Sequence, residues 1–387
     1  MNYAPTTGTK RIVTLDILRG ISLLGILIAN MLLFHTPFFY IQPYLYFTEQ
    51  VDITAFKWIS IFVQASFYPI FAFLFGYGIQ MQYAKSFETG ASFNKLTIRR
   101  LVLLLLFGVA HALLLWSGDI LFTYAVLGFS LLLFVKLSPK ALLIIATLLY
   151  TIPGLFLYAL AKLVSVLGSE FLAEAIVDQE KFEQAFAIYG NGSFSEIFNF
   201  RLVEWLSFGL TSTFLGVFIV LPLMLFGVAM AKVQLFERAS TYKTRLLIIG
   251  FISALLGVLI KSLPYLIGPT YEFMQLQSTF GGVFLAIGYV ALFLVLTTSE
   301  KVRRIFMPFS YIGRMSFTTY LMQSFIATMI FYGIGFGYYG SVNIWTGTLI
   351  AFVIFIAQTI FAKVWLMKFK QGPLEKLWRI GIYGKKK

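Results

Sequence analysis

The sequence has 387 residues, of which 59% are hydrophobic and only 12% are charged, and its net charge is +14. A soluble domain carries roughly 25% charged residues, so this composition excludes an ordinary soluble protein and indicates a membrane protein. The chain has no cysteine, which excludes disulfides and thiolate sites, and two histidines are too few for a polyhistidine metal site. We therefore expect no metal and, because the basic charge is typical of membrane topology, no nucleic-acid partner.

Apolar stretches long enough to cross a hydrocarbon core of ~30 Å recur along the chain. They predict an all-α, polytopic bundle of about ten spans, because the alternating pattern of a membrane β-barrel is absent. The expected spans cover residues 14–34, 57–82, 98–116, 120–137, 140–164, 205–231, 244–266, 278–298, 315–335 and 343–369. The first span is too long for the core of a signal peptide, so we expect it to be retained.

The distribution of charge predicts the orientation. With the N-terminus in the cytoplasm, 25 of the 30 basic residues fall inside and 11 of the 16 acidic residues fall outside, and both termini are cytoplasmic. We expect one integral membrane domain over residues 1–387, divided into a five-helix half (1–164), an external acidic loop (165–204) and a second five-helix half (205–387). A short amphipathic helix is expected around residues 171–188 of the loop.

The first span carries the first polar cluster, and polar groups within a membrane tend to mark functional sites. Asp16 and Arg19 lie three residues apart, on one helical face, where they can pair. The pair is either a structural clasp or a means of presenting Arg19 to the phosphates of a cytoplasmic ligand. Asn30 lies eleven residues, about 16 Å, further along the helix, beneath the outer surface.

The third and fourth spans carry a second cluster. Arg99 and Arg100 begin the third span, His111 lies near its outer end, and a short turn through Asp119 leads into the fourth. Such a turn forces an antiparallel hairpin, which would bring Asp119 or Tyr124 near the imidazole and create a carboxylate-oriented base. The alternative is that His111 only packs or caps the end of its helix.

Four further residues are candidates for binding substrate. Arg314 places a charge beside an aromatic run, and Trp116 lies at a predicted interface. His35, at the outer end of the first span, is either structural or part of the site. Gln323 lies within a span, where a glutamine can also hydrogen-bond to a neighbouring helix and so stabilise the bundle. Walker, Rossmann and nucleophile-elbow motifs are absent from the sequence.

Five motifs in order along the chain resemble the YeiB-like family of bacterial membrane proteins, whose C-terminal half is a domain of unknown function. They are Leu15-Asp16-Ile17-Leu18-Arg19-Gly20 followed by Asn30; Leu74-Phe75-Gly76-Tyr77-Gly78; Arg99-Arg100 with His111, Trp116 and Gly118-Asp119-Ile120-Leu121; Gly313-Arg314-Met315-Ser316 with Tyr320 to Ser324; and Gly372-Pro373-Leu374-Glu375 with Trp378-Arg379. One departure is Ser66, where the family commonly has a lysine.

The first motif also resembles that of transmembrane acyltransferases such as heparan-α-glucosaminide N-acetyltransferase, which share an Asp-x-x-Arg-Gly sequence. The resemblance implies acyl-CoA on the cytoplasmic side and an acceptor outside, with Asp16 and Gly20 as structural residues. Surface-polysaccharide O-acetylases have a functional histidine eleven residues after the arginine, where this chain has Asn30.

The leading hypothesis is therefore an acyltransferase in a bacterial cytoplasmic membrane, among membrane lipids. Arg19, Arg99, Arg100 and Arg314 would bind the donor acyl-CoA. His111, oriented by Asp119, would activate the acceptor hydroxyl or amine, and Asn30 would stabilise the oxyanion. The alternatives are a permease for a small or amphiphilic solute and a lipid-binding protein without turnover. The oligomeric state, a homo-oligomer included, stays open.

Overall fold

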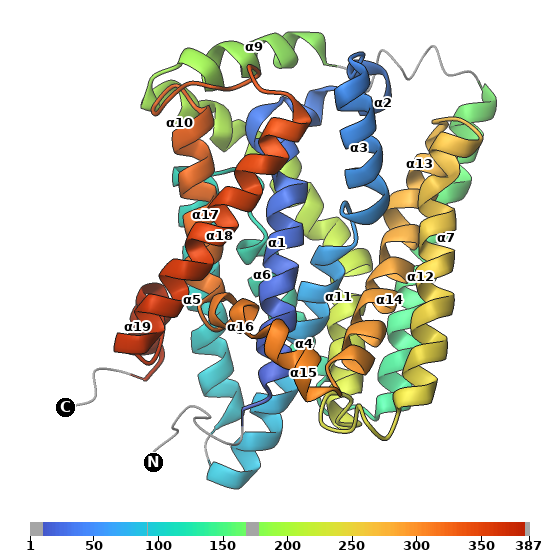
Figure 1. Cartoon of the computed structure of the whole chain (residues 1–387), viewed down its shortest axis with the longest axis vertical. Coiled ribbons are helices and arrows are strands. Elements are labelled where there is room, and N and C mark those ends of the chain that lie inside the picture. The colour runs from blue at the N-terminus through green and yellow to red at the C-terminus, as the bar shows by residue number, and fades with distance from the viewer. Residues whose placement is uncertain (1–10, 91, 168–177, 384–387) are drawn as a thin grey trace.

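The computed structural model describes residues 11–90, 92–167 and 178–383, and within these ranges every regular element is a helix. Figure 1 shows most of the longer helices running roughly side by side in one bundle. The longer helices are α1 (Val13–His35), α3 (Gln50–Phe62), α4 (Phe67–Thr89), α5 (Phe93–Leu114), α6 (Leu121–Phe134), α7 (Pro139–Leu167), α11 (Leu210–Lys232), α12 (Lys243–Leu266), α14 (Gly282–Leu296), α17 (Ser316–Phe331) and α18 (Ile344–Lys368).

Shorter elements connect these helices or extend them. They are η2 (Phe38–Tyr40), α2 (Pro43–Tyr46), α9 (Gln179–Asn191), α10 (Phe194–Glu204), α13 (Tyr271–Leu276), α15 (Glu300–Ile305), α16 (Met307–Arg314) and α19 (Pro373–Tyr383), together with two π-helical turns, η3 (Trp205–Gly209) and η4 (Gln277–Gly281). Each π-helical turn joins a short helix to the long helix that follows, so that α10 continues into α11 and α13 into α14.

Within the described residues, eight helical stretches are long and apolar enough to cross a membrane, so the expectation of about ten spans is confirmed only in part. The two that fall short are α6, with 14 residues, and α17, with 16. At 1.5 Å per residue these helices are about 21 and 24 Å long, less than a hydrocarbon core of ~30 Å. Their N-terminal ends lie within one residue of the expected starts, and both helices end early, α6 at Phe134 rather than 137 and α17 at Phe331 rather than 335.

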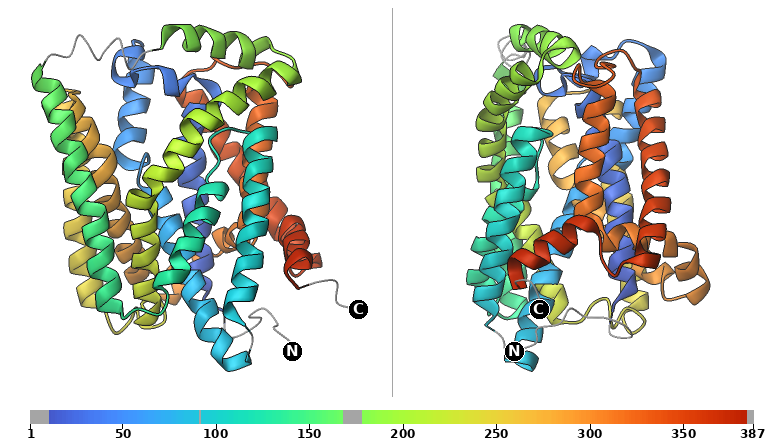
Figure 2. Two further views of the ribbon diagram at one scale, coloured as in Figure 1. Left: turned by 180° about the vertical axis from the view of Figure 1, so that it is seen from behind. Right: turned by 90° about the vertical axis from the view of Figure 1, so that its left-hand side faces the viewer.

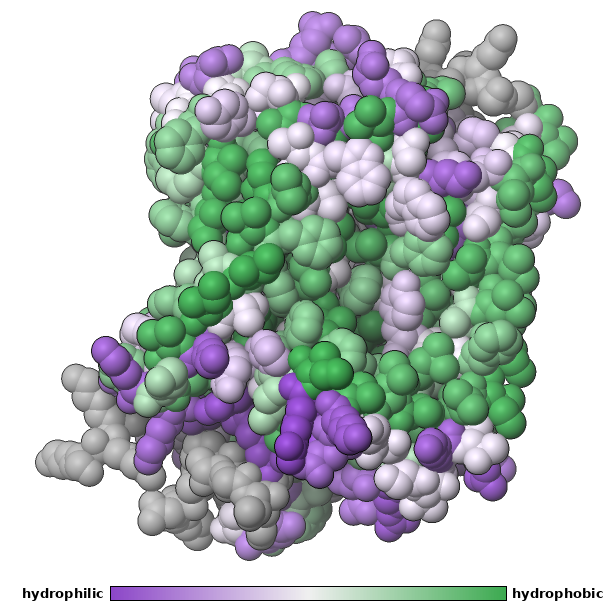
Figure 3. Space-filling model, viewed as in Figure 1, coloured by the Kyte–Doolittle hydropathy of each residue, from purple (hydrophilic) through white to green (hydrophobic). Residues whose placement is uncertain are grey.

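The surface has the distribution expected for a membrane protein. Apolar side chains gather over the middle of the molecule, and hydrophilic ones gather at its two ends (Figure 3). Leu148 on α7, Ile252 on α12 and Val353 on α18 are 52%, 51% and 60% exposed, although each is a large apolar residue. In water such exposure would be unfavourable, so these helix faces are suited to contact with lipid.

The polar segment between α7 and α11 differs from the expected external loop. The expected helix around residues 171–188 corresponds in part to α9, whereas residues 171–177 lie outside the described part of the chain. A further helix, α10, begins at Phe194 and runs into the span that was expected to start at residue 205. Its start is fixed by a capping box in which Ser193 and Glu196 bond reciprocally, a polar signal that a hydropathy profile overlooks.

The helix α1 is packed closely against α16 through glycines on both helices. A Cβ atom on Gly313 would lie 1.8 Å from the carbonyl oxygen of Asp16, and one on Gly20 would lie 2.1 Å from the carbonyl oxygen of Phe309. Small residues allow such approach between membrane helices, which gain little from the hydrophobic effect when they associate in lipid. Gly20 thus has the structural position expected for it, and α16 carries Arg314 to within reach of α1.

Substitution of Gly313 by Ala is expected to lower the free energy of unfolding by about 1–3 kcal/mol, because the added methyl group must push α16 away from α1. Denaturant unfolding of the purified protein in detergent measures the change. Gly190→Ala is the control, since no atom lies within 4 Å of the Cβ position at Gly190 on α9. Equal stability of the two variants would contradict this account of the crossing.

The C-terminal helix α19 lies across the bundle, at the end of the molecule where α1 begins (Figures 1 and 2). Its Glu375 carboxylate accepts hydrogen bonds from the backbone N–H groups of Phe317 and Thr318, at 2.9 and 3.1 Å, and from the Thr318 hydroxyl at 2.6 Å. A carboxylate at this position satisfies donors at the start of α17 and favours the positive end of its dipole. Glu375 therefore holds α19 against the start of α17.

Candidate functional site

A cavity of about 300 Å³ opens where α1, α4, α5, α6, α16, α17 and α19 meet. We call it the arginine cavity, because five arginines are among the side chains that line it. These are Arg11, Arg19, Arg100, Arg314 and Arg379. None of the described residues in its lining is acidic.

The carboxylate of Asp16 lies directly behind two of these guanidinium groups. Asp16 is 3% exposed and bonds to Arg11 and to Arg19, whose Nη1 lies 3.3 Å from Asp16 Oδ1. The clasp expected at the start of α1 is thus present, and Arg19 still lines the cavity. Burial and repulsion from Arg11 lower the pKa of Arg314, as expected where positive charges gather without enough counter-charge. An anion bound here would relieve that repulsion.

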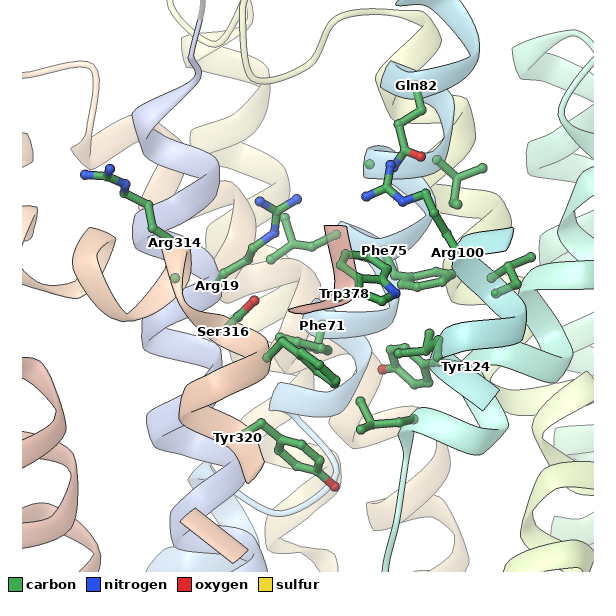
Figure 4. Close-up of a pocket in the computed structure, with 18 of the residues that line it drawn as sticks. Arg19, Phe71, Phe75, Gln82, Arg100, Tyr124, Arg314, Ser316, Tyr320 and Trp378 are labelled. Atoms are coloured by element: carbon green, nitrogen blue, oxygen red, sulfur yellow. The ribbon is translucent and has the colours of Figure 1, made fainter. Parts of the chain in front are cut away.

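The remainder of the arginine cavity is aromatic. Its aromatic lining residues are Phe71, Phe75, Tyr124, Phe317, Tyr320 and Trp378. Figure 4 shows Arg19, Arg100 and Arg314 toward one end of the pocket and Tyr320 at the other. Trp378 lies between them, with its ring 4.9 Å from the guanidinium carbon of Arg100. The cavity therefore combines an anion-binding end with an apolar depth, an arrangement that suits an amphiphilic ligand.

Beyond Tyr320 lies the hairpin between α5 and α6, which holds a buried histidine and carboxylate. Nδ1 of His111 is 2.7 Å from Oδ1 of Asp119, and neither side chain is exposed. The other Asp119 oxygen accepts a hydrogen bond of 2.6 Å from the backbone N–H of Phe122 and so caps the start of α6. The contact that the short turn suggested is present. His111 lies about one turn before the end of α5 at Leu114.

The second ring nitrogen of His111 points to a role for the pair. Nε2 is buried and has no hydrogen-bond partner among the described residues. A neutral imidazole that donates from Nδ1 to Asp119 keeps Nε2 as an acceptor, which is the state that a general base requires. His111 does not itself line the arginine cavity, but its ring centroid lies 5.1 Å from that of Tyr320, which does.

A buried network fixes the hairpin in place. Glu204 on α10 is 5% exposed and accepts hydrogen bonds from Ser117 in the turn, at 2.8 Å, and from Tyr40, at 2.9 Å. Arg201, which is fully buried, donates to the backbone carbonyl of Leu113 at 2.9 Å. Sequence analysis missed both charged residues, because hydropathy assigned them to an exposed acidic loop.

Four residues expected to bind substrate, one of them His35, lie outside the arginine cavity. Arg99 faces α19, where its Nη1 lies 3.4 Å from a backbone carbonyl oxygen. Trp116 is buried, with its ring centroid 4.4 Å from that of Phe34. Gln323 donates a hydrogen bond of 3.2 Å to Gln358 of α18, which fits the alternative role of a hydrogen bond between helices. Arg99 and Arg100, adjacent in sequence, point to different neighbours because successive helical residues are rotated by about 100°.

Asn30 and His35 are also separated from the His111 pair. Asn30 is half-buried on α1 and lines neither of the two cavities described here. His35 lines a second cavity, at the other end of α1 from Arg19. Among the described residues the structure has no group of three or more histidine and acidic side chains suited to a metal ion.

Sequence analysis also overlooked a charged residue within a span, in the last two turns of α12. Lys261 on α12 is 1% exposed, and its amine donates to the carbonyl of Gln64 and, at 2.9 Å, to the hydroxyl of Ser66. These acceptors lie in the break between α3 and α4, where Ala65 has a φ of 57°. The family commonly has a lysine at the position of Ser66. In this chain the amine of Lys261, on α12, lies at that position instead.

Comparisons with known proteins give relatives along nearly the whole chain. Residues 230–385 match the model of a protein family of unknown function, DUF418. The chain is 35% identical to the uncharacterized protein YxaH of Bacillus subtilis, over 98% of this chain and 96% of that one. It is 28% identical to the uncharacterized protein YeiB of Escherichia coli, over 96% of each. An uncharacterized 39.9 kDa protein of Bacillus acidopullulyticus is 27% identical, and no solved structure matches.

Proposed function

The chain belongs to the DUF418 family, together with the uncharacterized proteins YeiB and YxaH, and we propose that it is a membrane-embedded acyltransferase. Membership confirms the family resemblance that its motifs suggested. One observation carries the functional proposal: a single cavity has five arginines around one end and, at the other, a tyrosine that contacts a buried histidine–aspartate pair.

The proposed donor is an acyl-CoA. Its phosphates would lie among Arg11, Arg19 and Arg314, because guanidinium groups bind phosphate through paired, charge-assisted hydrogen bonds. The pantetheine arm and acyl chain would extend along the aromatic lining toward Tyr320. Because Tyr320 both lines the cavity and contacts His111, a rotation of its side chain would join the cavity to Nε2 of that histidine.

In the proposed reaction, Nε2 of His111 takes the proton from the hydroxyl or amine of the acceptor as its oxygen or nitrogen bonds to the acyl carbon. The carbon–sulfur bond then breaks, and the same proton passes to the sulfur, so that coenzyme A leaves as a thiol. Asp119 would orient the imidazole and stabilise its charged form. The proposal gives no part to Arg99, Trp116, Gln323 or Asn30, which lie outside the arginine cavity.

The proposed orientation places the arginine end of the molecule in the cytoplasm of a bacterium, since the basic loops gather there. With α6 and α17 counted as short crossings inside the bundle, the chain crosses the cytoplasmic membrane ten times and both termini are inside. Charged coenzyme A would then reach the site without crossing the membrane, and the acceptor would approach from outside.

Binding of the donor tests the proposal most directly. Purified protein in lipid nanodiscs is titrated with acetyl-CoA and longer acyl-CoAs by calorimetry, and roughly micromolar binding is expected for at least one chain length. The matched acyl-pantetheine, which lacks the nucleotide and its phosphates, is expected to bind at least about 100-fold more weakly, because it forgoes the charge-assisted hydrogen bonds. Failure of every acyl-CoA to bind, or equal binding of the two compounds, would refute the assignment.

A permease is the second candidate, and the break between α3 and α4 favours it. Transporters often have discontinuous helices and charged side chains within the membrane, and Lys261 lies here beside such a break. Counterflow of a solute in proteoliposomes without acyl-CoA, abolished by Lys261→Met, would support the permease. Retention of acyl-CoA binding by the same variant is the result expected of the acyltransferase.

A further inference from the structure

The second cavity has a volume of about 200 Å³ and is distinct from the arginine cavity. We call it the His35 cavity. It is lined by residues of α1, α2, α3, α18 and the loops between them. On α1, His35 lies sixteen residues from Arg19, which corresponds to about 24 Å along the helix axis. The two cavities therefore lie toward opposite ends of the molecule.

The imidazole of His35 lacks any partner within the described protein. The residue is 1% exposed, and neither Nδ1 nor Nε2 has a hydrogen bond to a described residue. Its ring lies against Phe331, with 5.5 Å between the ring centroids, and a Cβ atom on Gly347 would lie 2.6 Å from Nε2. A buried polar group left unpaired costs about 1–3 kcal/mol, so an unpaired imidazole on a residue that lines a cavity indicates a polar ligand.

The side chains around the imidazole define the charge of that ligand. Glu49 and Thr48 are exposed and Asp52 is half-buried, so they form the mouth of the cavity above His35. One oxygen of Asp52 accepts a hydrogen bond of 2.7 Å from the backbone N–H of Ile344. None of the described residues that line this cavity is a lysine or arginine, in a chain whose net charge is +14.

Helix capping accounts for the carboxylates but not for the histidine. Glu49 and Asp52 lie at the start of α3, where acidic residues favour the positive end of the dipole. A histidine at the end of a helix commonly bonds to the last carbonyl groups, yet both nitrogens of His35 are unpaired within the described residues. The unpaired imidazole is thus a second observation, independent of the acidic residues, that indicates a binding site at the start of α3.

We propose that the His35 cavity binds a small solute that carries a protonated primary amine and a hydroxyl group. The ammonium group would lie between the carboxylates of Glu49 and Asp52, and the hydroxyl would hydrogen-bond to His35. A cavity of this size admits only a small molecule or the end of a larger one. The proposal concerns binding alone and does not depend on acyl transfer.

Ethanolamine is the probe, titrated by calorimetry into the protein in nanodiscs of phosphatidylglycerol, which contain no amine lipid. Ethanolamine is expected to bind, and Glu49→Gln and His35→Phe are each expected to raise its Kd at least tenfold. Ethylamine, which lacks the hydroxyl, is expected to bind to the unmodified protein more weakly than ethanolamine does. To His35→Phe the two amines are expected to bind equally well. Choline, which has no N–H group, is expected to bind at least tenfold more weakly than ethanolamine.

Glu300→Gln is the control, since Glu300 is exposed, pairs with Arg304 and lies far along the chain in α15. Its Kd for ethanolamine should be unchanged. Thermal unfolding of His35→Phe should remain a cooperative transition, which shows that the variant is folded when its Kd is measured. No binding of ethanolamine, or equal binding by the unmodified protein, Glu49→Gln and His35→Phe, would overturn the proposal. Because acyl-CoA is absent from these titrations, either proposal can fail while the other stands.

Discussion

Replacing Asp119 by Asn is expected to lower the rate of acyl transfer about 10²- to 10⁴-fold, the range typical of a lost general base. The carboxylate lies 2.7 Å from Nδ1 of His111, and an asparagine there cannot stabilise an imidazolium ion. The amide can also present its N–H₂ group to the ring, which would favour the tautomer that is protonated at Nε2. Transfer from radiolabelled acyl-CoA to an acceptor extracted from the membrane measures the rate.

Two further variants separate catalysis from folding. His111→Ala should lower the rate by a similar factor, and the double variant should be little worse than either, because residues that act as one unit are not additive. Thr359→Val is the control, since the Thr359 hydroxyl bonds only to a backbone carbonyl of its own helix, α18. Affinity for acyl-CoA should be unchanged in all of them. Full activity of both Asp119→Asn and His111→Ala would remove the pair from the mechanism.

Hydropathy predicted the membrane helices well, and its errors have a physical origin. A hydropathy profile records how apolar a segment is, but not where the backbone leaves the helical conformation. It therefore extended the third span to residue 116, although α5 ends at Leu114 before the turn through Asp119, and it started a span at 205 although the helix begins at Phe194. In both places polar groups decide the boundary: Asp119 caps α6, and Ser193 caps α10.

The site was predictable where its residues are close in sequence. Asp16 with Arg19, and His111 with Asp119, are separated by three and eight residues, so helical spacing or a short hairpin brings each pair together. Arg379 was missed because it reaches the cavity from a helix whose docking depends on Glu375 and the start of α17. The sequence did show a short amphipathic segment after a Gly-Pro pair, and Arg379 lies in it. The local sequence does not predict against which helices that segment packs.

The rotation of a helix about its axis is the information that sequence lacks most. Arg99 and Arg100 are equally basic and adjacent, yet only Arg100 lines the arginine cavity. Packing against α19 fixes which of the two faces inward, through the contact of Arg99 with a backbone carbonyl and the stacking of Arg100 on Trp378.

The double variant Arg19→Gln with Arg314→Gln is expected to raise the Kd for acyl-CoA roughly 10²- to 10⁴-fold, since a hydrogen bond to a charged group contributes about 1.5–3 kcal/mol. The control is Arg245→Gln with Arg303→Gln, which removes the same charge from two exposed positions outside the cavity lining and should leave the Kd within about threefold. Calorimetry at two salt concentrations gives both values, and binding to the cavity variant should depend less on salt. If both double variants weakened binding equally, the overall positive charge of this end of the protein, rather than the arginine cavity, would account for the affinity.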